Sequence, residues 1–333
     1  MQHHQSSILA GCFMMITTLT AIPSATRAES SPGQGHAKQL DRATIETLIG
    51  KITVQLREGY VFPDKGALAA DALEAAYANN SYADVTDPAN FALRLTEQLR
   101  EITNDSHIRV IFGSPFSNQP SPSAPKDAGF EVKRLNGNIG YIHLSRFAPP
   151  EVFNPAADDA IAELTDTAAL IIDMRDNGGG HPASVAYLIS FLLDPAQRVH
   201  INDLIWRNRG TTTFRTESFW SSPTPKTYLG KPVYVLVGPK TYSAGEEFAY
   251  DLQVLKRATV VGETTRGGAN PGGLNELGSD LYVVVPPGRA QNPITQGNWG
   301  GTGVHPDIRS SSDEAQNTAL ALATAQTTAR SSK

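Results

Sequence analysis

A serine at the junction of a predicted strand and a predicted helix is the first candidate for covalent chemistry. The stretch KPVYVLVGPKTYSAGEEFAYDLQ, 231–253, opens as a buried strand, and its apolar residues then take up helical spacing. Ser243 stands at the corner, and SAGE matches the capping box S-x-x-E, in which Glu246 reaches back to the serine. A side chain at a helix N-terminus also lies in positive potential, which favours a forming alkoxide. The stretch alone is compatible with both a helix cap and a nucleophile.

A triple glycine follows a second predicted buried strand. The stretch DMRDNGGG, 173–180, precedes a predicted helix, and Gly178 and Gly179 would let backbone N–H groups turn outward as an anion site. A tight strand-to-helix turn would need glycines here as well. The stretch lacks the Gly-Lys-Ser/Thr ending of a Walker loop and the G-x-G-x-x-G fingerprint, which excludes those two phosphate-binding motifs. Anion or oxyanion binding is therefore one of two interpretations.

A catalytic serine needs a base, and no spacing rule selects one among the histidines. His107 lies in NDSHIRV, where a loop turns into a strand, with Ser106 beside it. His181 follows the triple glycine, and His305 lies in GVHPDI. Members of a triad are adjacent in space and not in sequence, so the choice stays open at this point. The other histidines beyond the first 28 residues are His36, near the start of the chain, and His143 and His200, in strand-like surroundings.

The first 28 residues have the pattern of an export signal. The stretch ILAGCFMMITTLTAI, 8–22, is apolar but too short to span a membrane, and the small residues after it predict cleavage after Ala28. LAGC imitates a lipoprotein signal, but it precedes most of the apolar run instead of following it. We therefore expect a signal peptide at 1–28 and an exported protein, periplasmic or secreted, without a membrane-integral segment. Because Cys12 is the only cysteine, cleavage would exclude disulfides and cysteine-ligated metals.

Two kinds of pattern divide the rest of the chain. From 39 to 99 apolar residues recur at helical spacing, and the short apolar piece HIRVIF follows. A Pro- and Ser-rich stretch predicts a linker at 113–128. Beyond it strands alternate with helices, which is typical of a largely parallel sheet with helices packed on it. We therefore expect an N-terminal helical domain at 38–112 and an α/β core domain at 129–325. The net charge of −5 and the absence of a basic run argue against a nucleic-acid partner.

Five ordered blocks together resemble the C-terminal-processing, or tail-specific, serine peptidase family. They are NDSHIRVIF, GNIGYIHLSRF, LIIDMRDNGGG, TYSAGEEFAYDLQVLKRATVVGETTRGG and NWGGTGVHPDI, and the resemblance extends from about Arg42 to Asp307. More narrowly, the blocks are similar to the branch related to interphotoreceptor retinoid-binding protein and the tricorn core. The resemblance implies a Clp protease/crotonase-like αβ superhelical core preceded by a small helical domain. It also implies a peptide or unfolded protein as substrate, and no metal or cofactor.

The resemblance further implies which residues act. The processing branch carries a PDZ domain and takes a lysine base from a GERTFGKG-like block, but here the block reads GETTRGGA, with Gly268 in the lysine's place. Arg266 cannot replace that lysine, because a guanidinium does not deprotonate in a protein. The stretch 113–128 is too short for a PDZ domain. The tricorn-like branch uses a histidine preceded by serine, which matches this sequence. Carried over, the nucleophile is Ser243, the general base His107 and the oxyanion hole the backbone N–H groups of Gly179 and Ala244, with Ser106, Glu246 and Gly178 in support.

One block departs from that branch. It reads NWGGTGV, with Gly300 where the branch has a glutamate that orients the base. A base without its orienting carboxylate can lose on the order of 10⁴ in rate. Ser106 with a water, or another carboxylate such as Glu276 or Asp280, could replace the glutamate. We therefore predict a serine-type peptidase of reduced turnover that acts by acyl transfer.

Two other functions are compatible with the same sequence. One is a binding module that holds a hydrophobic ligand or a peptide on this fold, with catalysis lost through Gly300. The other is a crotonase-like lyase or thioesterase, because that superfold is shared and a fold does not determine function. The sequence gives no indication of the oligomeric state or the cleavage specificity.

Overall fold

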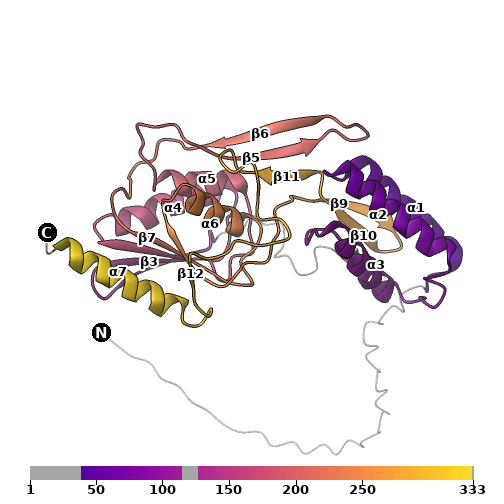
Figure 1. The fold of residues 1–333 in the computed structure, drawn as a ribbon, viewed down its shortest axis with the longest axis horizontal. Helices are drawn as coiled ribbons and strands as arrows, with labels where there is room; N and C mark the ends of the chain where they lie inside the picture. Colours follow the sequence, from indigo (N-terminus) through magenta and orange to yellow (C-terminus); the bar gives the residue numbers. More distant parts are fainter. Residues whose placement is uncertain (1–38, 115–126, 332–333) are drawn as a thin grey trace, which may run out of the picture. The chain divides into compact units, whose positions relative to one another are not determined.

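The computed structural model describes residues 39–114 and 127–331. The predicted signal peptide at 1–28 and residues 115–126 of the predicted linker lie outside these ranges. Within them the chain forms seven helices and twelve strands (Figure 1). The strands belong to one large sheet and two small ones.

The large sheet has six strands in the order β12-β8-β7-β4-β3-β2. Every neighbouring pair is parallel except β2 and β3, which pair antiparallel. The central strands β4 and β7 are buried along their whole length, as expected for a sheet covered on both faces. The α/β prediction is therefore confirmed. The strand bounds are β2 Phe130–Leu135, β3 Ile139–Leu144, β4 Ala169–Asp173, β7 Val233–Val237, β8 Thr259–Gly262 and β12 Ile308–Arg309.

Helices cover both faces of this sheet. On one face α4 (Pro150–Leu164), α5 (Pro182–Ser190) and α6 (Ala244–Val254) bury a continuous cluster with Leu170 and Ile172 of β4. On the other face α7 (Ala315–Ser331) packs its alanines against Ile171 of β4. Alternate residues of a strand point to opposite faces, which explains this division. The carboxyl ends of β4 and β7 lead into α5 and α6, so the turns after these two strands are neighbours.

The helical segment near the N-terminus shares its core with a hairpin from much later in the chain. Helices α1 (Arg42–Gly59), α2 (Pro63–Ala78) and α3 (Pro88–Thr103) lead into β1 (Arg109–Phe112). β1 pairs with β10 (Leu281–Val285), which pairs with β9 (Gly273–Gly278), both antiparallel. Apolar residues of β9 and β10 belong to the same buried cluster as the three helices. The segment expected as a helical domain at 38–112 therefore includes residues 273–285 in its core.

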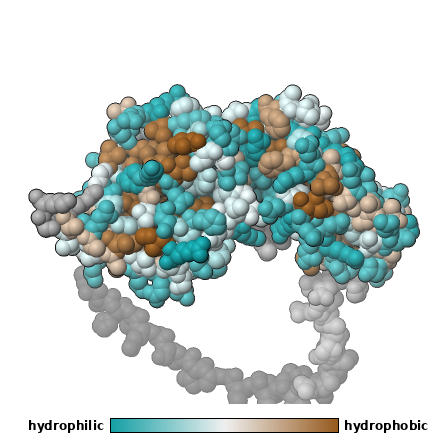
Figure 2. Space-filling model, viewed as in Figure 1, coloured by the Kyte–Doolittle hydropathy of each residue, from teal (hydrophilic) through white to brown (hydrophobic). Residues whose placement is uncertain are grey.

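A third sheet is antiparallel and has the order β11-β5-β6. It consists of β5 (His200–Arg207), β6 (Phe214–Trp220) and β11 (Gly288–Gln291). β5 and β6 pair antiparallel, and both contain aromatic residues. β6 is an edge strand and is largely exposed. On the face drawn in Figure 2, apolar residues gather in separate patches with hydrophilic residues between them.

Helix α6 carries two buried carboxyl groups one turn apart, Glu247 and Asp251. The Oδ1 atom of Asp251 accepts a hydrogen bond from Asn292 at 2.8 Å. The Oε1 atom of Glu247 and the Oδ2 atom of Asp251 have no partner in the described part of the chain. Burial raises the pKa of Glu247 to about 8, and burial together with the neighbouring Glu247 raises the pKa of Asp251.

We expect the free energy of unfolding to fall as the pH rises from about 6.5 to about 8. Unfolded Glu247 ionises near its ordinary pKa of 4.5, whereas the folded form keeps its proton until about pH 8, so the raised pKa stabilises the fold only at lower pH. The fall is at most about 1.4 kcal/mol per pH unit for each such group. Glu247→Gln is expected to flatten it, and Glu97→Gln on the exposed face of α3 to leave it unchanged. Urea denaturation across this pH range is the measurement, and a wild-type stability that rises there contradicts the prediction.

Candidate active site

Ser243 immediately precedes α6 and has a strained backbone. Its φ of 54° and ψ of −120° lie where residues with a side chain are rarely found, at a cost of ~1–3 kcal/mol. Its carbonyl oxygen accepts the N–H groups of Glu246 and Glu247, both at 2.9 Å. The N–H of the preceding residue, Tyr242, donates to the Asn177 carbonyl at 2.9 Å. These bonds hold the half-buried serine at the corner between β7 and α6 that the sequence predicts.

Glu246 reaches back to Ser243, as the capping box predicts, and also binds a second segment. Its fully buried carboxylate accepts the N–H of Ser243 at 2.9 Å, of Gly268 at 2.7 Å and of Gly267 at 2.6 Å. It also accepts the hydroxyl of Thr265 at 2.5 Å. Burial raises the pKa of Glu246, and the four donors oppose that rise because they favour the ionised form. One side chain therefore holds the backbone of Ser243 against residues 265–268.

The glycine-rich turn after β4 packs directly against Ser243. A Cβ atom on Gly179, where φ is 106°, would lie 2.8 Å from the Cβ atom of Ser243. A Cβ atom on Gly180, where φ is 143°, would lie 2.0 Å from the carbonyl oxygen of Phe147. Both positions therefore require glycine. Gly178 has neither a positive φ nor an atom within 4 Å of where its Cβ would be, so its glycine is not sterically required.

Asn177, which the sequence analysis did not single out, joins the glycine turn to the serine turn. Its buried side chain accepts the N–H of Gly179 at 2.8 Å and donates to the Leu144 carbonyl at 3.0 Å. Its own carbonyl accepts the N–H of Tyr242. The asparagine directly before the three glycines was the one available signal, because a short polar side chain there can bond its own turn.

The two predicted oxyanion donors, Gly179 and Ala244, differ in whether their N–H groups already have an acceptor. The N–H of Ala244 has no acceptor among the described residues, as expected for the first residue of a helix. The N–H of Gly179 is engaged by the side chain of Asn177. The N–H of Gly180 has no acceptor in the part of the chain that the structure describes, and Gly180 lines a cavity together with Ser243 and Ala244. Ala244 and Gly180 therefore both line the cavity beside Ser243 with backbone N–H groups that have no acceptor among the described residues.

His107 lies where a lysine base at position 268 would have to pass. Its ring stacks on the ring of Tyr242, with centroids 4.7 Å apart and planes 27° apart. A Cβ atom on Gly268 would lie 2.2 Å from the Tyr242 ring and 2.7 Å from Cε1 of His107. The histidine stack and a side chain at 268 therefore exclude one another. Among the described residues, no hydrogen bond joins His107 to the Ser243 hydroxyl. The His107 ring instead stacks on Tyr242, the residue directly before Ser243.

The Ser106 hydroxyl contacts Tyr242, the residue before Ser243, and not the ring of His107. Its hydroxyl lies 3.2 Å from the Tyr242 hydroxyl and donates to the Gly267 carbonyl at 3.2 Å. Its carbonyl accepts the Arg100 guanidinium at 2.9 Å. Ser106 is thus joined to the ring that stacks on His107.

Asp105 is the carboxylate nearest to the ring of His107, and the sequence analysis missed it. Its Oδ1 atom lies 4.0 Å from Nδ1 of His107 and accepts the backbone N–H of the same residue at 2.9 Å. Its Oδ2 atom accepts the Tyr60 hydroxyl at 3.0 Å and the Asn270 amide at 2.9 Å. Nδ1 of His107 is buried without a hydrogen-bond partner in the described structure and faces Asp105 at 4.0 Å.

The surroundings of His107 disfavour its charged form. Burial, followed by the nearby guanidinium groups of Arg109, Arg266 and Arg100, lowers the pKa of His107 to about 4. The imidazole is therefore neutral at pH 7, as a general base must be. The same field makes the imidazolium that forms during proton transfer unfavourable. For Asp105, burial raises the pKa, and the donors from Asn270, His107 and Tyr60 oppose that rise.

The two carboxylates considered as replacements for the missing glutamate lie in and just after β9. Glu276 is in β9 opposite Tyr282 of β10, and Asp280 is in the turn between these strands, next to the end of β1 that is farther from His107. Gly300 does not have a positive φ, and a Cβ atom there would meet only Asn298 Oδ1 at 3.0 Å and Ala269 at 3.4 Å. The next residue donates its N–H to the Gly267 carbonyl at 2.9 Å, so the NWGGTG turn adjoins the segment held by Glu246. A side chain at position 300 is compatible with the backbone.

The other described histidines have structural contacts of their own. His181 caps α5 by accepting the N–H of Ala183 at 3.2 Å, and His305 bonds Thr264 at 3.1 Å. His200 pairs with Asp203 at 2.7 Å and stacks on Trp220. His143 lies 3.8 Å from Glu131. His107 is the buried histidine among residues 39–114 and 127–331.

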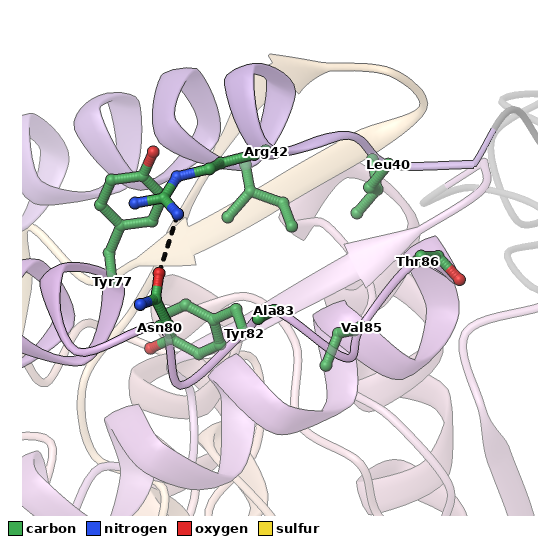
Figure 3. Close-up of a pocket in the computed structure, with 9 residues that line it drawn as sticks. Leu40, Arg42, Tyr77, Asn80, Tyr82, Ala83, Val85 and Thr86 are labelled. Carbon is green, nitrogen blue, oxygen red and sulfur yellow. Dashed lines mark hydrogen bonds between the residues drawn. The ribbon is translucent and has the colours of Figure 1, made fainter.

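Two cavities differ in their relation to Ser243. A small one of about 40 Å³ opens beside it, with largely apolar walls and Glu247 as its carboxyl group; its lining is Gly180, Pro182, Leu204, Ser243, Ala244, Glu247, Gly268, Ala269, Pro271, Ala290 and Trp299. Another of about 160 Å³ lies in the helical segment, where Arg42 bonds Asn80 at 2.8 Å and lies over Tyr77 (Figure 3). None of the predicted site residues lines that second cavity.

The described residues show no metal-type cluster of three or more His, Cys, Asp or Glu side chains. None of the described helices is both long and apolar enough to cross a membrane.

Comparison with known proteins gives two family matches. A model described as peptidase family S41 matches residues 138–310. A model described as the N-terminal domain of S41 peptidases in eukaryotic IRBP matches residues 40–134. The two matches together include the serine turn, the glycine turn and the segment of His107.

Curated relatives with sequence similarity are processing peptidases and a tricorn protease. The chain is 33% identical over 155 residues to carboxyl-terminal-processing peptidase 2, chloroplastic, of Arabidopsis thaliana, covering 44% of this chain and 27% of that protein. It is 29% identical over 178 residues to the carboxyl-terminal-processing protease of Synechocystis, covering 51% and 38%. It is 28% identical to the tricorn protease of Thermoplasma volcanium, covering 43% and 12%. The matched part is thus well under half the length of these relatives.

Solved structures with the same fold include peptidases. A candidate peptidase from Parabacteroides merdae superposes with a TM-score of 0.64 at 21% identity, covering 84% of this chain and 96% of that one. The photosystem II D1 C-terminal processing protease superposes with a TM-score of 0.52 at 16% identity, covering 81% and 94%. At these identities the likeness establishes the fold, which agrees with the predicted αβ core.

The glycine turn supplies a matched pair of variants. We expect Gly180→Ala to lower the free energy of unfolding by at least ~2 kcal/mol, because its Cβ would meet the Phe147 carbonyl at a φ of 143°. Gly178→Ala is expected to change it by less than ~0.5 kcal/mol, because nothing lies near the added methyl group. Urea denaturation of both variants is the measurement. Equal stabilities would show that the backbone around Phe147 and Gly180 is not as described.

Proposed function

Because the chain belongs to peptidase family S41, we propose that it is a serine peptidase in which Ser243 is the nucleophile and His107 the general base. The observation that carries the proposal is the combination of a strained serine ahead of α6 with free N–H groups on Ala244 and Gly180 beside it. The stack of His107 on Tyr242 supports histidine as the base, since it fills the space that a lysine at position 268 would need.

The residues support an acyl-transfer reaction in two halves. His107 takes the proton of the Ser243 hydroxyl while Oγ attacks the substrate carbonyl carbon, and the oxyanion is held by the N–H groups of Ala244 and Gly180. The C–N bond then breaks as His107 passes that proton to the leaving amine. Water next attacks the acyl-enzyme and gives a proton to His107, which returns it to Oγ as the acid product leaves. The Ser243–His107 hydrogen bond would form when substrate binds, because such bonds are often long in free enzymes.

Asp105 is the positioning residue for the base in this proposal. A carboxylate on the Nδ1 side of an imidazole selects the tautomer and stabilises the imidazolium. The 4.0 Å distance to Nδ1 of His107 and the absence of another partner for that atom among the described residues support this role. It would act where the family's tricorn-like branch has the glutamate that Gly300 replaces.

The substrate class and the location are further parts of the proposal. We propose a peptide or an unfolded protein as the substrate. Ser243 is only half-buried, so an extended peptide chain can reach its hydroxyl. The pattern of residues 1–28 supports export to the periplasm or the medium.

The second candidate function is a binding module with little or no turnover. The lowered pKa of His107 and the glycine at position 300 both favour it, since each weakens proton transfer. In that case the cavity beside Ser243 would hold a peptide or an apolar group without cleaving it.

A fluorophosphonate probe separates these two functions. We expect wild-type protein to be labelled at Ser243 and to hydrolyse an unstructured peptide, and Ser243→Ala to lose both properties. The fold should persist in the variant, with a loss of no more than about 2 kcal/mol, because Glu246 holds the backbone N–H and not the hydroxyl. Labelling is read by intact-mass analysis. Wild-type turnover in Ser243→Ala would disprove the assignment of the nucleophile, and an unlabelled, inactive wild type would favour the binding module.

Steady-state kinetics of Asp105→Asn and Gly300→Glu test how the base is oriented. Asp105→Asn is expected to lower kcat at least ten-fold with little change in KM and to move the acidic limb of the pH profile to lower pH, because a negative charge beside His107 is lost. Gly300→Glu is expected to raise kcat about ten-fold or more and to move that limb to higher pH. Asp280→Asn is the control and should change neither. An unaltered kcat and pH profile in Asp105→Asn would exclude Asp105 as the positioning residue.

A further inference from the structure

Four buried polar side chains form a cluster on the inner side of α6. Glu247 and Asp251 lie one turn apart on that helix, Asn202 belongs to β5 and Asn292 follows β11, and each is at most 5% exposed. Burial raises the pKa of Glu247, and the Asn202 amide opposes that rise. Burial and then the charge of Glu247 raise the pKa of Asp251, and the Asn292 amide opposes that rise. The four groups therefore act on one another, and we call them the buried carboxyl cluster.

Only one carboxyl oxygen of this cluster is held by a neighbouring amide. Asn292 donates its amide N–H to Oδ1 of Asp251 at 2.8 Å, and its amide oxygen accepts the N–H groups of Ile294 at 2.9 Å and Thr295 at 3.2 Å. This amide therefore orients Asp251 and is itself fully used. Among the described residues, Oδ2 of Asp251 and Oε1 of Glu247 have no hydrogen-bond partner.

Asn202 adds an unpartnered amide to the same cluster. It is fully buried, and neither its Oδ1 nor its Nδ2 atom has a hydrogen-bond partner in the described chain. The register of β5 with β6 shifts between His200 and Asn202, and a bulge of this kind re-aims side chains. Ile201 and Asn202 are accordingly both buried, although consecutive residues of a regular strand point to opposite faces. Because neither end of the Asn202 amide is engaged, its oxygen can face the carboxyl of Glu247.

The unpartnered oxygens of the cluster suit a hard cation. A buried carboxyl group either keeps its proton or needs a positive partner, because an isolated charge in the core is unfavourable. Side chains one helical turn apart have Cβ atoms about 5–6 Å apart, so one ion with bonds of about 2.3–2.6 Å can contact both carboxylates. Carboxylate and amide oxygens are the ligands that Ca²⁺ and Mg²⁺ prefer. One divalent ion balances the two negative charges.

We propose that Glu247, Asp251 and Asn202 bind one hard divalent cation, Ca²⁺ or Mg²⁺, with water as its remaining ligands. The site has two acidic ligands and an amide, so it is not among clusters of three or more His, Cys, Asp or Glu side chains. Glu247 also lines the cavity of about 40 Å³ beside Ser243, which offers the ion a path and has room for water. The ion would join α6 to β5 behind the serine. No step of the proposed acyl transfer depends on it.

Calorimetric titration of the chelator-treated, full-length protein with CaCl₂ and with MgCl₂ at pH 8 tests the site. We expect one ion per chain with a Kd of about 1 mM or below, as for other Ca²⁺ sites outside cells. Glu247→Gln, Asp251→Asn and Asn202→Leu should each weaken binding at least ten-fold, because each removes an oxygen ligand or its charge with little change in shape. The matched controls are Glu97→Gln and Glu101→Gln, which change exposed carboxyl groups at the same spacing on α3 and should leave the affinity unaltered.

The pH dependence separates a bound cation from a bound proton. The titratable groups that act on the pair are Glu247 and Asp251 themselves, from α6, whereas β5 and the turn after β11 contribute the amides of Asn202 and Asn292. Because burial raises the pKa of Glu247 to about 8, a proton competes with the ion below that pH, and the affinity should be at least ten-fold weaker at pH 6 than at pH 8. A saturating cation should also remove the fall in the free energy of unfolding that metal-free protein is expected to show from about pH 6.5 to about 8.

A carboxyl pair that only keeps its protons gives different results. Absence of saturable binding of both ions at pH 8 overturns the cation site, and so does a fall in stability with pH that persists in both salts. Binding that is unaltered in Glu247→Gln places the ion elsewhere and also overturns it. If Asp251→Asn fails to fold, a melting temperature that CaCl₂ or MgCl₂ raises in wild type and not in Glu247→Gln still supports the site. None of these readouts uses hydrolysis, so their failure leaves the peptidase assignment intact.

Discussion

The buried carboxylate of Glu246 is the interaction on which the rest of the site depends. Taking an ionised carboxylate out of water is unfavourable unless its oxygens are hydrogen-bonded, and here four donors within 2.5–2.9 Å satisfy both of them. Hydrogen bonds to a charged group each contribute about 1.5–3 kcal/mol, which is enough to offset the strain at Ser243. The same donors place Gly267 and Gly268 next to the serine turn. The Gly267 carbonyl then accepts the N–H of Gly301 from the NWGGTG turn. Gly268 packs against the stacked rings of His107 and Tyr242.

The structure shows one half of the capping box, because Glu246 accepts the backbone N–H of Ser243 whereas the Ser243 side chain makes no capping hydrogen bond. In the sequence SAGE, the glutamate that reaches back to the serine backbone also holds the segment that adjoins the base. A capping box that only began a helix would leave Glu246 at the surface, whereas here it is fully buried. The bond from Glu246 back to Ser243 is the one that the local pattern predicts. The bonds from Glu246 to Gly267 and Gly268, about twenty residues further along the chain, could not be predicted from it.

The features that the sequence predicts are those that depend on local periodicity or on one tight turn. The alternation of buried strands and helices, the serine corner and the glycine turn all follow from patterns within a few residues. The pairing of Asp105 with Asn270 and the closure of the helical segment by β9 and β10 join residues more than 150 positions apart, and such contacts leave no mark on the nearby sequence. Asp105, two residues before His107, was visible in NDSH but had no periodic signal that assigned it a role. The engagement of the Gly179 N–H by Asn177 was hidden for another reason, since a glycine run shows that backbone turns outward but not which N–H stays free.

The electrostatics of the site combine two opposing requirements of acyl transfer. The oxyanion needs positive potential, which the N-terminus of α6 and the free N–H groups supply, whereas the imidazolium that forms at the same moment needs negative potential. Around His107 the balance is strongly positive, because Arg100, Arg109 and Arg266 have no carboxylate partner in the described chain and Glu246 is already satisfied by its own donors. Among the described residues, the Asp105 carboxylate lies 4.0 Å from the ring of His107, and it already accepts hydrogen bonds from Tyr60, Asn270 and the backbone N–H of His107. The potential around His107 in the free protein therefore favours a negative charge nearby and disfavours protonation of the histidine. Acyl transfer by such a site therefore requires negative potential on the Nδ1 side of His107, where Asp105 lies at 4.0 Å.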